Sequence, residues 1–245
     1  MISEFPLFVF TLLGGMGAGA YLFTAFLPRR ESDKPWLFPA IVLVLLAVSG
    51  VALLGHLGKP AGMFNAFTNP TSGITLEGFT SMIFGLLVVI DLVLAWQKKD
   101  VAIVRMLAAV AGLLLMCAMG YTYYTFIGMP QWGTVECFPL FVLGGIATGA
   151  TLAAFFVQDG YRGASLAAGA IVALAANAVA ILAEGAHFAA VGIDATPFIC
   201  GAVLVVVAVG VAIYGRKSDA SWVLPCAIAL ALVGTAVARY AFYLI

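Results

Sequence analysis

FPLFVFTLLGGMGAGAYLFTAFL, residues 5–27, is an uninterrupted apolar run without a charged side chain. A helix needs about 20 mostly apolar residues to cross a bilayer core of about 30 Å. The run satisfies that length and is too long for the core of a signal peptide, so we expect a retained membrane span and no cleaved leader. Hydrophobic residues make up 64% of the chain and charged residues 9%. This composition excludes a large soluble domain and indicates a polytopic membrane protein of the all-α class.

Eight apolar runs of this kind follow one another, separated by proline, charged and turn residues. We predict transmembrane helices near residues 5–27, 37–57, 76–96, 102–126, 138–157, 164–188, 197–214 and 220–243.

The basic residues are distributed unevenly over the connections between these spans. One set of alternate connections, with the adjoining helix ends, holds Arg29, Arg30, Lys34, Lys98, Lys99, Arg105, Arg162, Arg216 and Lys217. The other side holds only Lys59 and Arg239. By the positive-inside rule this bias places the first set in the cytoplasm and both termini on the outer side of a bacterial cytoplasmic membrane.

The word FPLFV occurs twice, at Phe5–Val9 and at Phe138–Val142, and each copy precedes a glycine-rich run. We interpret this as a parallel internal repeat that relates two four-helix units, residues 1–130 and 131–245. The proline of each word fits the first turn of a helix, and the glycines after it permit close helix contacts.

Most other ionisable residues within the spans lie toward the predicted outer face. They are His56, Glu77, Glu184, His187 and Arg239. Ionisable groups in or near hydrocarbon are costly, so their gathering at one depth predicts a functional site there. Asp91, near the inner end of its span, is expected at the interface. The four cysteines form no C-x-x-C pair, so we expect small packing residues, with no iron–sulfur cluster and no metal site.

HLGKPAGMFNAF, residues 56–67, followed by Glu77, closely resembles the membrane anchor subunit family of bacterial dimethyl sulfoxide reductases, which is related to the polysulfide reductase membrane subunits. Three further places match the family pattern. They are Glu4–Leu7 with Thr11; Tyr123, Pro130 and Trp132; and Arg239 with Phe242 and Tyr243.

The resemblance implies a subunit that is not catalytic alone but oxidises menaquinol near the outer face during anaerobic respiration. Its electrons would pass to a four-cluster iron–sulfur subunit and a molybdopterin catalytic subunit. The family's quinol-site residues match His56, Glu77 and Gly58. Where some relatives carry a loop arginine, this chain has Gly62. Specificity for the terminal acceptor would belong to the molybdenum pocket of the partner.

The residue types themselves suit quinol oxidation. A neutral imidazole at His56 accepts a hydrogen bond from a quinol hydroxyl, and a carboxyl at Glu77 relays a proton outward. Arg239 either contacts the quinol or joins Glu184 in a buried charge pair that holds the two halves together.

Three alternatives stay open at this stage. His56 and His187 are the only histidines and would be the axial ligands of a haem b. A small-solute transporter would also carry internal repeats, although it would gather its polar groups near the midplane. An inert anchor would have no quinol site. In the favoured interpretation the chain contains no haem and its partners are the two redox subunits and the lipid bilayer, with no nucleic acid.

Overall fold

A computed structural model describes residues 4–56, 69, 71–126, 128–129 and 131–244, and for His56 the backbone only. In these residues the chain is all-helical, apart from one isolated β-bridge between Arg29 and Val157. The helices are α1 (Phe5–Phe26), α2 (Leu37–His56), α4 (Gly73–Trp96), α5 (Ala102–Tyr124), α6 (Cys137–Ala153), the short 3-10 helix η2 (Gly160–Arg162), α7 (Ala164–Ala190), α8 (Thr196–Gly215) and α9 (Val223–Tyr243).

Seven of these helices are long and apolar enough to cross a membrane, and α6 is a shorter apolar helix of 17 residues. All predicted spans begin and end within about four residues of an observed helix. The largest difference is at α6, which ends at Ala153 rather than near residue 157. Its chain turns away there because Val157 pairs with Arg29 and the Gln158 N–H donates to the Pro28 carbonyl at 2.8 Å.

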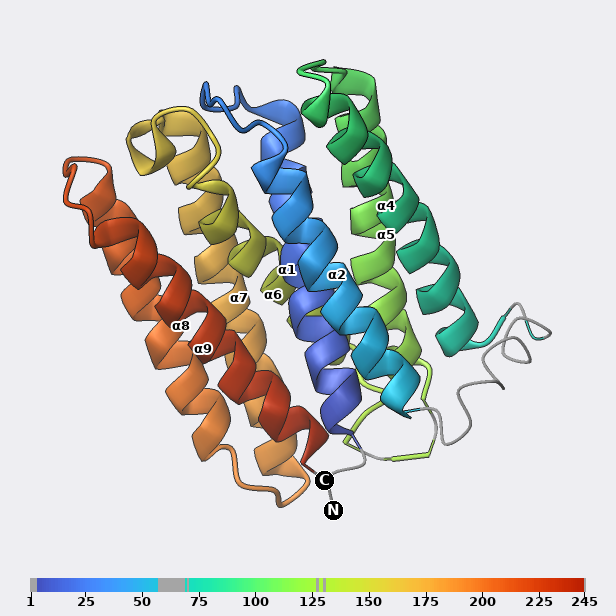
Figure 1. Cartoon of the computed structure of the whole chain (residues 1–245). Coiled ribbons are helices and arrows are strands. Elements are labelled where there is room, and N and C mark those ends of the chain that lie inside the picture. The colour runs from blue at the N-terminus through green and yellow to red at the C-terminus, as the bar shows by residue number, and fades with distance from the viewer. Residues whose placement is uncertain (1–3, 57–68, 70, 127, 130, 245) are drawn as a thin grey trace.

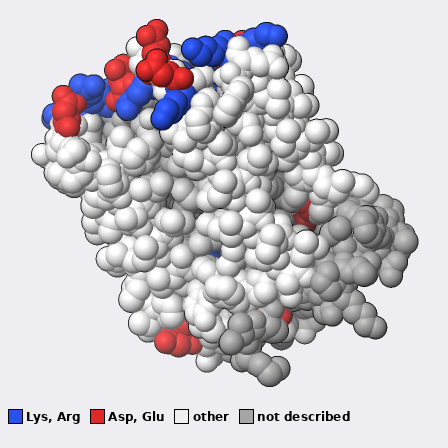
Figure 2. All heavy atoms as spheres, in the orientation of Figure 1, with Lys and Arg blue, Asp and Glu red and all other residues white. Residues whose placement is uncertain are grey.

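The connections of the bundle fall at two opposite ends (Figure 1). We call one the basic end, formed by residues 27–36, 97–101, 154–163 and 216–222. The other holds both chain termini, and we call it the terminal end. Lys and Arg gather with Asp and Glu at the basic end, while the visible sides of the bundle are almost free of charge (Figure 2). The segregation of basic residues predicted from the sequence is thus present in three dimensions, as in a multi-pass membrane protein.

Helices α1 and α6 pack against each other at the centre of the bundle, with α4 and α5 on one side and α7, α8 and α9 on the other (Figure 1). Glycines at a spacing of four residues line the contact, Gly15 and Gly19 on α1 and Gly145 and Gly149 on α6. A Cβ at Gly19 or Gly149 would collide with the backbone of the facing helix. The prediction that the glycine-rich runs permit close helix contacts is confirmed.

The sides of the bundle differ in how much protein covers them. Helices α2 and α4 are the least buried spans, and their outward faces carry large apolar side chains such as Val44, Val51, Met82 and Leu86. Exposed apolar residues on long helices are expected where lipid, not water, surrounds the protein. In contrast, α6 is almost entirely enclosed, so a helix shorter than the bilayer core is tolerated there.

Both copies of FPLFV open a helix, α1 and α6, as predicted. The relation between residues 1–130 and 131–245 as two repeated units stays a prediction.

Candidate functional site

Buried polar side chains collect where α1, α4 and α6 begin and α5, α7 and α9 end. Six such residues that are almost completely inaccessible to solvent lie in the described part of this region: Thr11, Thr75, Glu77, Glu184, Thr235 and Arg239. Four of the five residues predicted to share the outer face, Glu77, Glu184, His187 and Arg239, lie toward this terminal end, and His56 ends α2 at the same level. The gathering of ionisable residues predicted from the sequence is present at the terminal end.

Glu77 lies one turn inside α4, whose start is fixed by Ser72. The Ser72 hydroxyl accepts a hydrogen bond from the Thr75 N–H at 3.3 Å and so caps the helix. The Glu77 side chain is 1% exposed and is hydrogen-bonded with Thr122 of α5. Its Oε1 is buried with no hydrogen-bond partner among the described residues. A buried carboxyl oxygen without a partner is costly, so it is an acceptor available to a ligand or a proton.

His56 is the last residue of α2, and its side chain lies outside the described residues, as do Gly58, Lys59 and Gly62. The chain therefore brings the C-terminal end of α2 and the N-terminal end of α4 to the same end of the bundle (Figure 1). This hairpin is the arrangement predicted for His56 and Glu77. Contact between their side chains stays a prediction.

A group of aromatic side chains, which we call the aromatic cluster, fills the space between α5, α6 and α9. It consists of Tyr123, Trp132, Phe141, Phe242 and Tyr243. Tyr123 stacks on Phe141 with ring centroids 4.7 Å apart, and Trp132 stacks on Phe242 at 5.4 Å. The Trp132 indole N–H donates to the Phe242 carbonyl at 3.1 Å, which fixes the α5–α6 connection to the end of α9. Glu77 lies close enough to interact electrostatically with both tyrosine hydroxyls.

Arg239 is a charged group in contact with this cluster, and all the hydrogen-bond partners of its guanidinium among the described residues are backbone carbonyls. Its guanidinium donates to the Thr11 carbonyl at 2.6 Å, to that of Phe141 at 2.7 Å and to that of Leu140 at 3.4 Å. It also lies over the Phe141 ring, 5.1 Å from the centroid. Gly144 leaves room for it, because a Cβ there would lie 2.7 Å from Nη2. Arg239 thus joins α9 to α1 and α6.

The sequence left a pair between Arg239 and Glu184 as one possibility, and no such ion pair occurs among the described residues. Both Glu184 oxygens are buried without a hydrogen-bond partner there, and so is Nε2 of His187, one helical turn further along α7. Arg239 instead donates hydrogen bonds to backbone carbonyls of α1 and α6.

Residues that are far apart in the sequence but belong to the family pattern meet in this region: Thr11, Tyr123, Trp132, Arg239, Phe242 and Tyr243. They come from three separate stretches of the chain, near residue 11, at 123–132 and at 239–243. The model of the DMSO reductase anchor subunit (DmsC) family matches residues 1–245, the whole chain. The chain belongs to this family. No curated protein matches it at a significant level.

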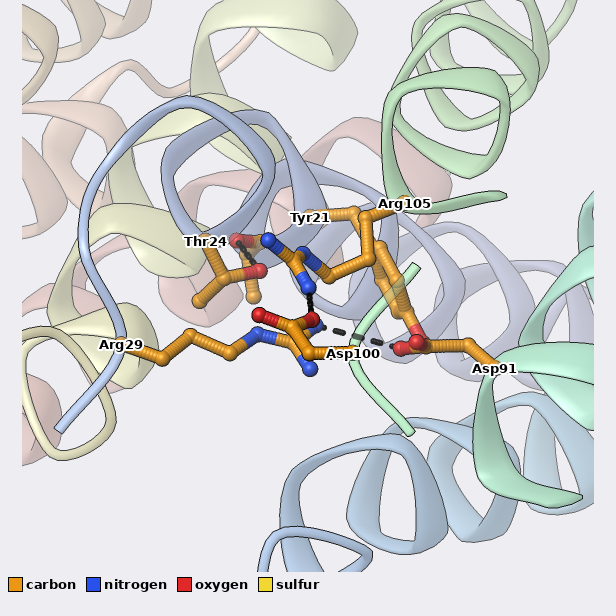
Figure 3. Close-up of polar contacts among 7 residues, drawn as sticks. Tyr21, Thr24, Arg29, Asp91, Asp100 and Arg105 are labelled. Carbon is orange, nitrogen blue, oxygen red and sulfur yellow. Dashed lines mark hydrogen bonds and ion pairs between the residues drawn. The ribbon is translucent and has the colours of Figure 1, made fainter. Parts of the chain in front are cut away.

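The DMSO reductase anchor subunit also has a polar network at its basic end that the sequence did not predict (Figure 3). Asp91 of α4 accepts a hydrogen bond from the Tyr21 hydroxyl at 2.9 Å and forms an ion pair with Arg29 at 3.1 Å. Asp91 was expected at the interface, and it does lie at the basic end, but it is only 3% exposed. Arg105 forms an ion pair with Asp100 nearby. Tyr21 and Arg29 are more than 60 residues from Asp91 along the chain, so no local sequence pattern reveals that they meet it.

The two ends of the anchor subunit can therefore do different chemistry. At the terminal end, a buried carboxyl oxygen of Glu77 has no hydrogen-bond partner among the described residues, which suits hydrogen bonding to a ligand and proton exchange. At the basic end the buried carboxylate is already neutralised. Two cavities of 540 and 330 Å³ lie at the basic end, and neither is lined by Glu77.

Proposed function

We propose that this anchor subunit binds menaquinol at its terminal end and oxidises it together with its partner subunits. The buried Glu77 carboxyl, whose Oε1 has no hydrogen-bond partner among the described residues, is the observation that supports the proposal best. An ionisable group at this depth in a membrane protein is energetically costly, so its presence favours a functional role. Residues that carry the resemblance to the family, such as Thr11, Tyr123 and Arg239, lie at the same end of the molecule.

The reaction releases two electrons and two protons as the quinol becomes a quinone. In our proposal His56 accepts the hydrogen bond of one hydroxyl and takes its proton, and Glu77 receives a proton and passes it to the outer aqueous phase. Gly58 is a further residue proposed to contact the quinol. Arg239 acts on the site through the α1 backbone, since it holds the Thr11 carbonyl beside the Thr11 hydroxyl that meets Tyr243 at 3.3 Å.

The electrons leave to a partner. The subunit is proposed to hold neither haem nor an iron–sulfur cluster, so the acceptor is a four-cluster iron–sulfur subunit that docks on the terminal end and feeds a molybdopterin catalytic subunit. Anaerobic respiration in the bacterial cytoplasmic membrane is the setting we propose, with both termini on the outer side. The segregation of Lys and Arg at the basic end supports this orientation.

We also propose that residues 1–130 and 131–245 are two four-helix halves related by a parallel repeat. In support, α1 and α6 open with the same word and face each other through glycines at the same spacing. The first half carries the long connection after α2 and Glu77, so we propose a single quinol site in that half.

The two histidines of the chain provide a matched test. In membranes containing the assembled complex, His56→Ala should lower menaquinol-dependent turnover by about 100-fold or more, the contribution typical of a general base. His187→Ala, which removes the other histidine, should leave turnover near the wild-type rate. The amount of assembled complex is measured in parallel, so that a loss of activity is not confused with a loss of protein.

The same pair of variants separates the alternatives. Normal turnover in His56→Ala would contradict a quinol site at this position and would support an inert anchor. A cytochrome b band in the reduced-minus-oxidised spectrum, lost in both variants, would instead establish a haem held by the two histidines.

A further inference from the structure

A cavity of 540 Å³ opens at the basic end, away from the proposed quinol site. Its walls come from the α1–α2 connection, the starting turn of α2, the last turns of α4 and the residues after α6. The lining combines charged residues with an apolar surface made by Leu37, Phe38, Phe155 and Phe156.

Local contacts hold these walls together. The Arg30 N–H donates to the Phe156 carbonyl at 2.7 Å, next to the β-bridge between Arg29 and Val157. The Phe38 and Phe156 rings pack with centroids 5.2 Å apart. On the α4 side, the backbone of Lys98 takes a left-handed conformation with φ 56°, and its N–H donates to the Ala95 carbonyl at 3.0 Å. The cavity is therefore part of the folded chain and not a gap between loose loops.

The cavity carries an excess of positive charge once its internal pairs are counted. Of the lining carboxylates, Asp91 is engaged by Arg29 and Tyr21, and Asp100 is engaged by Arg105. Four lining cations form no ion pair among the described residues. Only two further carboxylates line the described part of the cavity, Glu31 and Asp33, both in the α1–α2 connection. The four cations are Arg30, Lys34, Lys98 and Lys99.

One donor within the cavity also lacks an acceptor. Nε of Arg29 is buried and has no hydrogen-bond partner among the described residues, although Nη2 of the same guanidinium is paired with Asp91. A buried N–H of this kind is costly unless an acceptor is supplied. An anion seated in the cavity would supply one.

The position of the cavity indicates where that anion comes from. Trp36 and Trp96 pack beside it with ring centroids 5.2 Å apart, and tryptophans are enriched at the headgroup level of membranes. Trp96 is 67% exposed, at the end of the weakly covered helix α4. Helices α2 and α4 run from the basic end toward the terminal end (Figure 1). Their outward faces are apolar, so acyl chains could lie along them.

We propose that this cavity binds the phosphate headgroup of an anionic phospholipid, with the acyl chains lying against α2 and α4. Basic pockets at the ends of transmembrane helices recognise such headgroups. Arg30, Lys34, Lys98 and Lys99 supply the attraction at the rim, Arg29 supplies the buried donor, and the tryptophan pair sets the depth. The site depends on neither the quinol site nor the partner subunits.

The test removes the two lining charges of the α4–α5 connection and compares the result with an equal loss of charge elsewhere at the basic end. One variant combines Lys98→Asn with Lys99→Gln, because asparagine tolerates the left-handed conformation of residue 98. The control combines Arg216→Gln with Lys217→Gln, two exposed residues that do not line the cavity. The full-length protein in its complex is exchanged into nanodiscs of phosphatidylglycerol and phosphatidylcholine, and retained lipid is measured by native mass spectrometry.

We expect the wild-type protein and the control to retain phosphatidylglycerol over phosphatidylcholine, and the Lys98/Lys99 variant to retain at least about tenfold less phosphatidylglycerol. Menaquinol-dependent turnover, measured on the same samples, shows that the variant is folded. Equal retention in the variant and the control would overturn the proposal. So would displacement of the lipid by millimolar inorganic phosphate, because the site would then recognise free phosphate rather than a lipid headgroup.

Discussion

At the basic end Asp91 meets Arg29 and the Tyr21 hydroxyl, whereas at the terminal end Glu77 and Glu184 are buried without a cationic partner among the described residues. The single buried cation of the terminal end, Arg239, is held by carbonyls and not by a carboxylate. A charge that is neutralised within the protein contributes to holding helices together, while one that is left without a counter-charge retains its capacity to exchange protons or bind a ligand. The two ends thus differ in whether a buried acidic side chain is paired with a cation inside the protein.

The largest effect should come from exchanging the buried acidic side chains of Glu77 and Asp91 for amides. Glu77→Gln keeps the shape of the side chain but cannot take a proton, so menaquinol-dependent turnover should fall by about 100-fold or more. Asp91→Asn should lower the amount of assembled complex while leaving turnover per complex near the wild-type value. Steady-state assays normalised to assembled complex measure both. If Asp91→Asn lost as much turnover as Glu77→Gln, the division between the two ends would be wrong.

Arg239→Ala should be the most destabilising single change at the terminal end. It removes three hydrogen bonds from a charged donor, and each strong one is worth about 1.5–3 kcal/mol, so we expect a loss of about 3 kcal/mol or more. Thermal denaturation of the purified complex measures the change. Arg216→Ala, in the exposed connection after α8, serves as the control and should leave the midpoint unchanged. Equal midpoints for the two variants would show that the carbonyl contacts contribute little.

Gly149→Ala should have an intermediate effect that both ends share, because it acts at the central contact of α1 and α6. The new methyl group would meet the backbone of Gly19, and overpacking of this kind costs about 1–3 kcal/mol. Gly210→Ala on α8, where a Cβ would have nothing within 4 Å, is the matched control. The readout is the unfolding midpoint of the complex in detergent. A Gly149→Ala midpoint as high as that of the control would contradict the close contact.

The smallest effect should come from an exposed pair at the basic end. Arg162 and Asp219 are 2.8 Å apart, but both side chains are more than half exposed. Such pairs contribute about 0–1 kcal/mol, so Asp219→Asn should shift the unfolding midpoint little, and less still at high salt. A drop in the unfolding midpoint as large as that of Arg239→Ala would mean that this exposed ion pair contributes as much stability as the buried Arg239 contacts, which would contradict the prediction.

The helices themselves were largely predictable, because the signal is local. Apolar length, proline and charge mark each span, and every predicted span corresponds to a helix. The end of α6 was placed too late because it is set by contacts of residues 157 and 158 with the α1–α2 connection. The glycines were recognised as contact residues, but their pairing between α1 and α6 joins segments about 130 residues apart, which periodicity does not reveal.

The gathering of ionisable side chains near one end of the bundle was predictable from the sequence, but the partners that each side chain contacts were not. The sequence placed Glu77 at the opening of a span that begins near residue 76. The helix begins earlier, at Gly73, so Glu77 lies one turn inside it and is almost completely buried. The partners of Arg239 did not follow, because they are main-chain carbonyls, which every residue has and no motif marks. Tyr21 and Asp91 show the same difficulty, since each alone resembles an ordinary interfacial residue.

The contacts of Arg239 also have a consequence for biogenesis. The ribosome makes α1 first and α9 last, yet α9 supplies the guanidinium that ties α1 to α6. The glycine face of α1 packs against α6, which is made only after α2, α4 and α5. The hydrogen bonds from Arg239 to α1 and α6 therefore form later still, only after both of those helices and α9 have been made.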